Sequence, residues 1–154
     1  MSELAEVVVW TDGGARGNPG PAGYGVVVST PAGVVLAELS EPIGWATNNV
    51  AEYRGVIAGL ERARELRARR VRVRADSLLA VQQLRGNWKV KNAALRPLWA
   101  KAARLAGGFE RVTFEHVPRE RNRRADALAN RAMDAQGPVD GPVQGSFGDA
   151  PAAQ

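Results

Sequence analysis

Residues 48–75 carry the feature that most restricts the fold, a long helical pattern that leads into a short β pattern. Within "NNVAEYRGVIAGLERARELRAR", apolar side chains recur at the spacing of one helix face. "RVRVRA", residues 70–75, alternates as a half-buried strand does. The earlier apolar run "VVVWT", residues 7–11, predicts another strand, and a right-handed crossover through the helix makes the two strands parallel. We therefore predict a βαβ unit within an α/β domain.

The rest of the chain adds strands and helices to this unit. "YGVVVST" and "GVVLAELSEP" predict a hairpin that turns at residues 31–33. Later, "DSLLAVQQLRG" and "AALRPLWAKAARLAGG" predict two helices within one connection, "FERVTFEHV" a strand, and "RADALANRAMDA" a last helix. We expect an α/β fold with a five-stranded mixed sheet, three antiparallel strands followed by two parallel ones, flanked by helices.

Composition limits the class of protein and the kind of metal. The length of 154 residues and a hydrophobic share of 45% fit one domain with a substantial core. The chain has no cysteine and one histidine, His116, so a bound metal must be held by oxygen, which favours Mg²⁺, Mn²⁺ or Ca²⁺. No apolar stretch approaches the roughly 20 residues of a membrane span, and "MSELAEVVVW" lacks the basic region of a signal peptide. These features predict a cytoplasmic protein with no membrane partner.

The C-terminal residues differ in character from the rest of the chain. The stretch "AQGPVDGPVQGSFGDAPAAQ" lacks periodicity and is rich in glycine and proline. Such a composition offers few apolar side chains to bury. We predict a folded domain over residues 1–135 and a tail or linker over residues 136–154.

The positive charge of the chain suggests a polyanionic partner. The net charge is +5, and basic residues cluster in "RARELRARRVRVR" and "RERNRR". The same clusters also fit a solvated arginine-rich surface, so charge alone leaves the partner open.

Four acidic residues are expected to meet at one edge of the sheet. Asp12 ends the first predicted strand and Asp76 the fourth, and ligands of open α/β sheets bind at the carboxyl ends of parallel strands. Glu52 lies in the first turn of its helix and Asp126 early in the last helix. Carboxylates drawn together repel, and divalent cations relieve that repulsion. The sequence therefore predicts a metal site.

Each acid also has an ordinary structural explanation. Glu52 could close a capping box with Asn49, Asp126 could favour a helix N-terminus, and the two strand-end aspartates could start turns. The stretch "GGARGNPG" lacks the Gly-Lys-Ser/Thr ending of a nucleotide-binding loop. Its glycines permit close approach of a ligand, and Asn18 offers an amide to a sugar or base edge; alternatively, the stretch is only a tight turn.

Five motifs resemble one family, type 1 ribonuclease H, whose members cut the RNA strand of RNA/DNA hybrids. The motifs are "TDGGARGNPGPAGYG", "TNNVAEYRG", "ADSLLAV", "WKVKN" and "EHVPRERNRRADALAN", in the family's order, within residues 7 to about 135. The resemblance implies that two Mg²⁺ ions, or Mn²⁺, are bound by four acids: Asp12, Glu52, Asp76 and Asp126. It implies a catalytic role for His116 in a mobile loop.

The resemblance also implies contacts with the hybrid. Three asparagines match positions that contact the minor groove: Asn18, Asn48 and Asn49. Thr47 and Asn122 resemble phosphate-binding positions. The chain lacks room for the basic handle of many bacterial relatives, so it looks like the handle-less branch that includes ribonuclease H–phosphatase fusions. Trp88, Lys89 and Lys91 would then supply a reduced surface for the DNA strand, although a packed tryptophan with solvated lysines fits the same residues.

The function implied is hydrolysis of the RNA strand by two-metal-ion catalysis, leaving 5′-phosphate and 3′-hydroxyl ends. Two alternatives stay open: a non-catalytic hybrid-binding module and a related-fold nuclease that acts on DNA junctions. All four acids argue against the first, and the "TNN" and "GNPG" asparagines favour hybrid over junction. We expect a monomer, with a fused C-terminal domain in the full-length protein.

Overall fold

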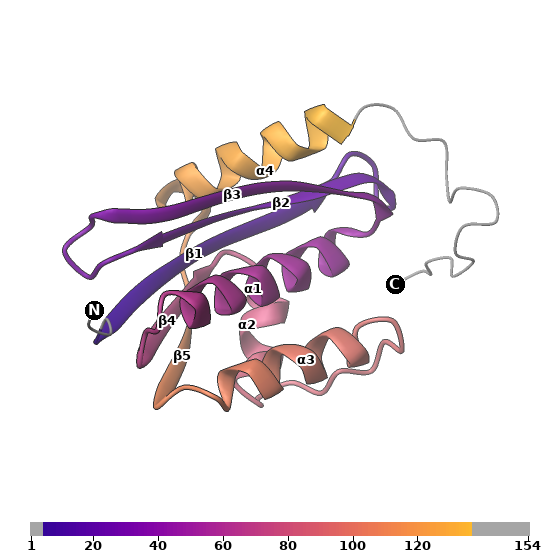
Figure 1. Ribbon diagram of the computed structural model, residues 1–154. Helices are drawn as coiled ribbons and strands as arrows, with labels where there is room; N and C mark the ends of the chain where they lie inside the picture. The colour runs from indigo at the N-terminus through magenta and orange to yellow at the C-terminus, as the bar shows by residue number, and fades with distance from the viewer. Residues whose placement is uncertain (1–4, 137–154) are drawn as a thin grey trace.

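The computed structural model describes residues 5–136 and contains one five-stranded sheet with helices on both faces (Figure 1). The strands are β1 (Glu6–Ala15), β2 (Gly20–Ser29), β3 (Val35–Ala46), β4 (Arg70–Ala75) and β5 (Arg111–His116). The helices are α1 (Asn48–Glu65), α2 (Leu78–Leu84), α3 (Arg96–Ala106) and α4 (Arg123–Gln136), with a short 3₁₀ turn, η1, at Arg119–Arg121. No helix within residues 5–136 is long and apolar enough to cross a membrane.

The sheet order is β3-β2-β1-β4-β5. β1 pairs antiparallel with β2, and β2 with β3, whereas β1–β4 and β4–β5 are parallel. The predicted fold class and the crossover through α1 are confirmed. The order follows from the connections: short turns join β1 to β2 and β2 to β3, and helical connections lead into β4 and β5.

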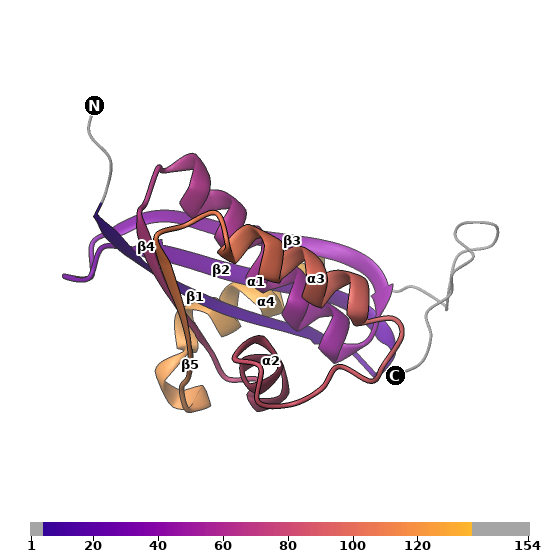
Figure 2. The ribbon, with the colours of Figure 1, turned by 90° about the horizontal axis from the view of Figure 1, so that it is seen from below.

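The main core lies between the sheet and the layer formed by α1 and α3 (Figure 2). Valines of β1, β2 and β4 pack there against Val56, Ile57 and Leu60 of α1. Two small residues let α1 approach β1 closely: a Cβ on Gly55 would collide with Thr11, and one on Gly59 would lie 2.5 Å from Val9 Cγ1. These two glycines therefore allow α1 to pack closely on β1.

α4 packs on the opposite face, mainly against β1, β2 and β3 (Figure 1). Gly23 and Gly25 of β2 lie directly beneath it, where a Cβ would collide with the α4 backbone or with Ala132 and Leu128. The helix therefore lies close to the sheet, and its side chains near Asp126 reach the end of β1.

The two helices before β5 are joined by residues 85–95 with no handle between them, as the sequence predicted. Two details differ from the sequence-based expectation. β1 continues to Ala15, because Gly13 and Gly14 pair with β2, so the turn is confined to residues 16–19. α4 runs to Gln136, one residue beyond the predicted domain boundary, and the rest of the predicted tail lies outside the described residues.

Candidate metal centre

Two aspartates lie where the parallel pairing of β1 and β4 stops. The last paired residues are Thr11 and Ala75, and Asp12 and Asp76 come directly after them. The expectation that Asp12 ends its strand was wrong, because β1 goes on pairing with β2 as far as Ala15. Asp12 and Asp76 still lie side by side, because β1 stops pairing with β4 after Thr11 while it goes on pairing with β2.

Glu52 reaches the same place from α1. Thr47 caps this helix by accepting a hydrogen bond from Val50 N at 3.2 Å. Gly13 has no side chain to hold the helix away, and a Cβ there would lie 2.7 Å from Glu52 N. The capping-box reading with Asn49 was wrong, because Thr47 is the cap and Glu52 Oε1 is buried without a hydrogen-bond partner.

Three carboxylates form a compact group. Asp12, Glu52 and Asp76 each offer an oxygen, and these oxygens lie within 4.8 Å of one another. Asp126 is outside this group but lines the same cavity of about 550 Å³. Asn130, one helical turn later, donates to Asp126 O at 3.0 Å and to Asp126 Oδ2 at 3.3 Å, which restrains that carboxylate.

The protein environment disfavours negative charge on this group. Burial, together with the charges and hydrogen bonds of Asp76 and Asp126, raises the pKa of Asp12 to about 8. Burial raises the pKa of Glu52 well above its usual value, and the negative charge of Asp12 is the second cause of this rise. A buried carboxylate oxygen without a partner and several oxygen ligands within reach of one another fit a hard divalent cation, which would supply the missing positive charge.

Basic and polar residues surround the carboxylates. His116, the last residue of β5, lines the cavity and is exposed. Arg16 and Arg119 line it too, and Arg16 also forms an ion pair with Asp134 at 2.9 Å. Sequence reasoning missed both arginines and Asn130. Asn130 could have been found, because it lies four residues after Asp126 and therefore on the same face of the last helix. Arg16 and Arg119 could not, because they lie in turns, whose position depends on the tertiary structure.

The predicted minor-groove asparagines gather beside the cavity. Asn48 lines it, and its Oδ1 accepts from Ala15 N at 2.8 Å. Asn18 Oδ1 accepts from Asn48 N at 3.0 Å, which ties the turn after β1 to the start of α1. Asn49 follows in the first turn of α1 and is partly buried. The Gly-rich stretch thus shapes one wall of the carboxylate cavity.

The two predicted phosphate-binding residues are engaged inside the protein. Thr47 is 4% exposed and caps α1. Asn122 is 1% exposed, and its Nδ2 donates to Thr11 O at 2.9 Å, so the amide joins the start of α4 to β1. Both side chains thus have partners within the protein, and Asn122 also lines a second cavity of about 220 Å³. Phosphate binding by these two residues stays a prediction.

Trp88, Lys89 and Lys91 lie on the connection between α2 and α3 and are not among the residues that line the carboxylate cavity. Trp88 is 44% exposed, which contradicts the packed-tryptophan reading, and both lysines are exposed.

Gln83 holds this connection in place, and sequence reasoning missed it. The residue is buried, and its Oε1 accepts from Tyr53 Oη at 2.6 Å while its Nε2 donates to Lys89 O at 3.1 Å. Its backbone carbonyl accepts from Trp99 Nε1 at 3.1 Å. No periodic pattern marks such a residue, because its partners come from three separate segments.

Known proteins resemble this chain in sequence and in fold. The family model described as Reverse transcriptase-like matches residues 10–132. The bifunctional protein Rv2228c of Mycobacterium tuberculosis is 56% identical over 131 residues, which are 84% of this chain and 36% of that protein. The chain thus spans about a third of the length of such relatives.

Solved structures agree with these sequence matches. The N-terminal RNase H domain of Rv2228c superposes with a TM-score of 0.84 at 56% identity, over 86% of this chain and 96% of that one. RNase H1 of the archaeon Halobacterium salinarum gives 0.82 at 44% identity, over 85% and 99%. LC11-RNase H1, solved in complex with RNA/DNA hybrid, gives 0.79 at 46% identity, over 84% and 97%. With its fold, its carboxylate group and these relatives, the chain belongs to the type 1 ribonuclease H family.

Proposed function

We propose that this protein hydrolyses the RNA strand of RNA/DNA hybrids and leaves 5′-phosphate and 3′-hydroxyl ends. The observation that carries the proposal is the group formed by Asp12, Glu52 and Asp76, with a buried, unpartnered oxygen on Glu52. A relative of the same fold has been solved in complex with RNA/DNA hybrid, which supports hybrid as the substrate.

The four acids are proposed to hold two Mg²⁺ ions, with Mn²⁺ as the other candidate. When bound, such ions lower the pKa of water and stabilise the charge that develops on the phosphate. The chain's own part is to bring the carboxylates together and hold them in place, which Asn130 helps to do at Asp126.

The remaining cavity residues are proposed to handle the substrate. His116 is placed to move a proton at the edge of the cavity. Arg16 and Arg119 are suited to contact phosphate oxygens. Asn18, Asn48 and Asn49 are proposed to contact the minor groove, where the 2′-hydroxyl distinguishes RNA from DNA.

A labelled RNA/DNA hybrid incubated with and without Mg²⁺ tests the activity, and analysis of the product ends tests the chemistry. Asp12→Asn should lower the cleavage rate at least ~10²-fold while hybrid binding is kept, because it removes a charged ligand but little volume. Glu65→Gln, which removes an exposed acid on α1 outside the carboxylate cavity, is the control. Near-normal turnover by Asp12→Asn would refute the metal-site assignment.

The junction-nuclease alternative is separated by substrate choice. If 2′-hydroxyls are read, a duplex with a run of ribonucleotides should be cut well, one with a single ribonucleotide poorly, and duplex DNA not at all. Comparable Mg²⁺-dependent cutting of duplex DNA or four-way junctions would favour the alternative. Binding without cleavage of any hybrid would favour the non-catalytic module.

The full-length protein is proposed to carry a further domain beyond the C-terminal residues, because a relative described as bifunctional is matched over 36% of its length. We propose a monomer for the ribonuclease H domain itself, which sedimentation would test. The cytoplasmic location stays a prediction.

A further inference from the structure

α4 covers only part of the sheet face on which it lies. Its main contacts are with β1, β2 and β3, and it lies over β2 and β3 in Figure 1. On β4, Val71, Val73 and Ala75 are buried on the α1 side of the sheet. Because strand side chains alternate, the intervening arginines point to the other face, beside α4. β4 and β5 therefore present an uncovered surface there.

This surface consists of three rows of side chains that cross β1, β4 and β5. The strand register pairs the residues as follows: Trp10, Arg74 and Glu115; Val8, Arg72 and Thr113; Glu6, Arg70 and Arg111. Asp12 lies two residues beyond Trp10 on β1, so it belongs to the same face by the same alternation, and Asp76 directly follows the last residue of β4. The surface thus continues directly from the carboxylate group.

The surface is hollowed and carries more basic than acidic side chains. One cavity of about 220 Å³ is lined by Trp10 and by three arginines: Arg74, Arg121 and Arg124. A second, of about 330 Å³, is lined by three further arginines and two acids: Arg70, Arg72, Arg111, Glu6 and Glu115. The ion pair between Arg74 and Glu115, at 2.9 Å, joins the two cavities. Two further acids pair with these arginines, Glu110 with Arg70 and Glu38 with Arg124, so six arginines face four acids and an excess of positive charge remains.

The arginines are held in place yet retain capacity for a ligand. Arg72 pairs with Glu6 at 2.7 Å, and Arg74 lies over the Trp10 ring at 4.9 Å from its centroid. Within residues 5–136, Arg111 and Arg121 have no acidic partner. η1 links this surface to the carboxylate cavity, because Arg119 lines the latter and Arg121 the former.

We propose that this basic sheet face, defined by Trp10, Arg70, Arg72, Arg74, Arg111 and Arg121, binds the phosphate backbone of a single-stranded nucleic-acid extension of the hybrid. The inference rests on the proposed function, because that function places the hybrid at the carboxylate cavity. Charge complementarity selects a polyanion, since guanidinium groups pair well with phosphates. A row of arginines with a neighbouring aromatic ring is the usual composition of a single-strand binding surface.

The test compares one short hybrid with blunt ends and the same hybrid with a single-stranded extension on either strand and at either end. Binding is measured by fluorescence anisotropy in EDTA, and kcat/KM in Mg²⁺. The parent protein should bind one of the extended hybrids more tightly than the blunt one. The double variant Arg72→Ala/Arg111→Ala should lose most of that gain and keep kcat/KM on the blunt hybrid within about twofold, because neither arginine lines the carboxylate cavity.

Salt gives a quantitative check. Two phosphate contacts to a single strand correspond to a slope of about 1.4 in log affinity against log salt, or roughly sevenfold between about 50 and 200 mM. The parent should lose this much more affinity for the extended hybrid than the double variant does.

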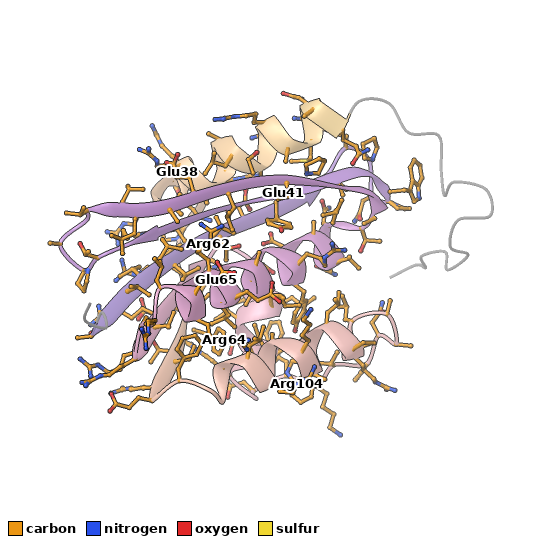
Figure 3. The ribbon with its side chains drawn as sticks, in the orientation of Figure 1. Glu38, Glu41, Arg62, Arg64, Glu65 and Arg104 are labelled. Atoms are coloured by element: carbon orange, nitrogen blue, oxygen red, sulfur yellow. The ribbon has the colours of Figure 1, made fainter. Side chains whose placement is uncertain are left out.

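Arg64→Ala/Arg104→Ala is the matched control. It removes the same charge from α1 and α3, which lie on the other side of the sheet from Glu38, the β3 residue that pairs with Arg124 of α4 (Figure 3). This control should keep the gain from the extension. Equal affinity of the parent for blunt and extended hybrids, an equal loss in the control, or an equal gain from a duplex extension would overturn the inference. Failure of the parent to cut the blunt hybrid would count against the proposed function instead.

Discussion

Replacing Asp12 by asparagine is expected to stabilise the metal-free protein, although it should abolish cleavage. In the folded protein the pKa of Asp12 is raised to about 8, chiefly by burial and then by Asp76 and Asp126. In the unfolded chain the carboxyl group loses its proton near pH ~4. The folded state therefore binds more protons between these values, and stability falls as the pH rises through this window.

The size of the effect follows from the pKa difference. Each pH unit above the unfolded pKa costs a little over 1 kcal/mol, so Asp12 destabilises the folded state by about 1–2 kcal/mol at pH 5 and roughly 4 kcal/mol at pH 7. Asparagine resembles the protonated side chain and avoids this cost. The melting temperature of Asp12→Asn should exceed that of the parent by about 10 °C or more at pH 7.

Denaturant unfolding in EDTA between pH 5 and pH 8 measures the difference between parent and variant. The difference should grow with pH, and Mg²⁺ should reduce it, because the cation stabilises only the protein that binds it. Asp134→Asn, an exposed acid, should show no such growth. A difference that stays constant across this range would refute the reasoning from burial and repulsion.

Three other changes test the packing. Gly55→Ala should lower the free energy of unfolding by about 1–3 kcal/mol in denaturant melts, because the new methyl group overlaps the Thr11 side chain. Gln83→Leu should lower the free energy of unfolding by about 1–3 kcal/mol, because it leaves the Tyr53 hydroxyl buried without its partner. If the α2–α3 connection contacts the DNA strand, the same variant should also bind hybrid more weakly, which fluorescence anisotropy measures. Deleting residues 138–154 should leave the melting temperature and the cleavage rate nearly unchanged, since this stretch has few apolar side chains; a large drop in melting temperature would show that it packs on the domain.

The sequence alone was enough to predict the order of the elements and the meeting of the acids. The alternation in residues 70–75 and the helical spacing in residues 48–65 reflect which side chains are buried, and burial repeats with the period of each element. A crossover of known handedness then places the carboxyl ends of β1 and β4 side by side. Asp12 and Asp76 could be paired from these rules without any tertiary contact being known.

Other features were decided only by the tertiary structure. Glycines have little preference for a strand, so the extension of β1 through Gly13 and Gly14 depends on hydrogen bonds to β2. Asn122 and Gln83 look like surface residues in the sequence, yet both are buried, because distant segments supply their partners. The basic sheet face likewise exists because α4 packs on β1 to β3 and leaves β4 and β5 uncovered. Local periodicity indicates which face of a helix or strand is buried. The partner that a side chain contacts on that face depends on segments far apart in the chain.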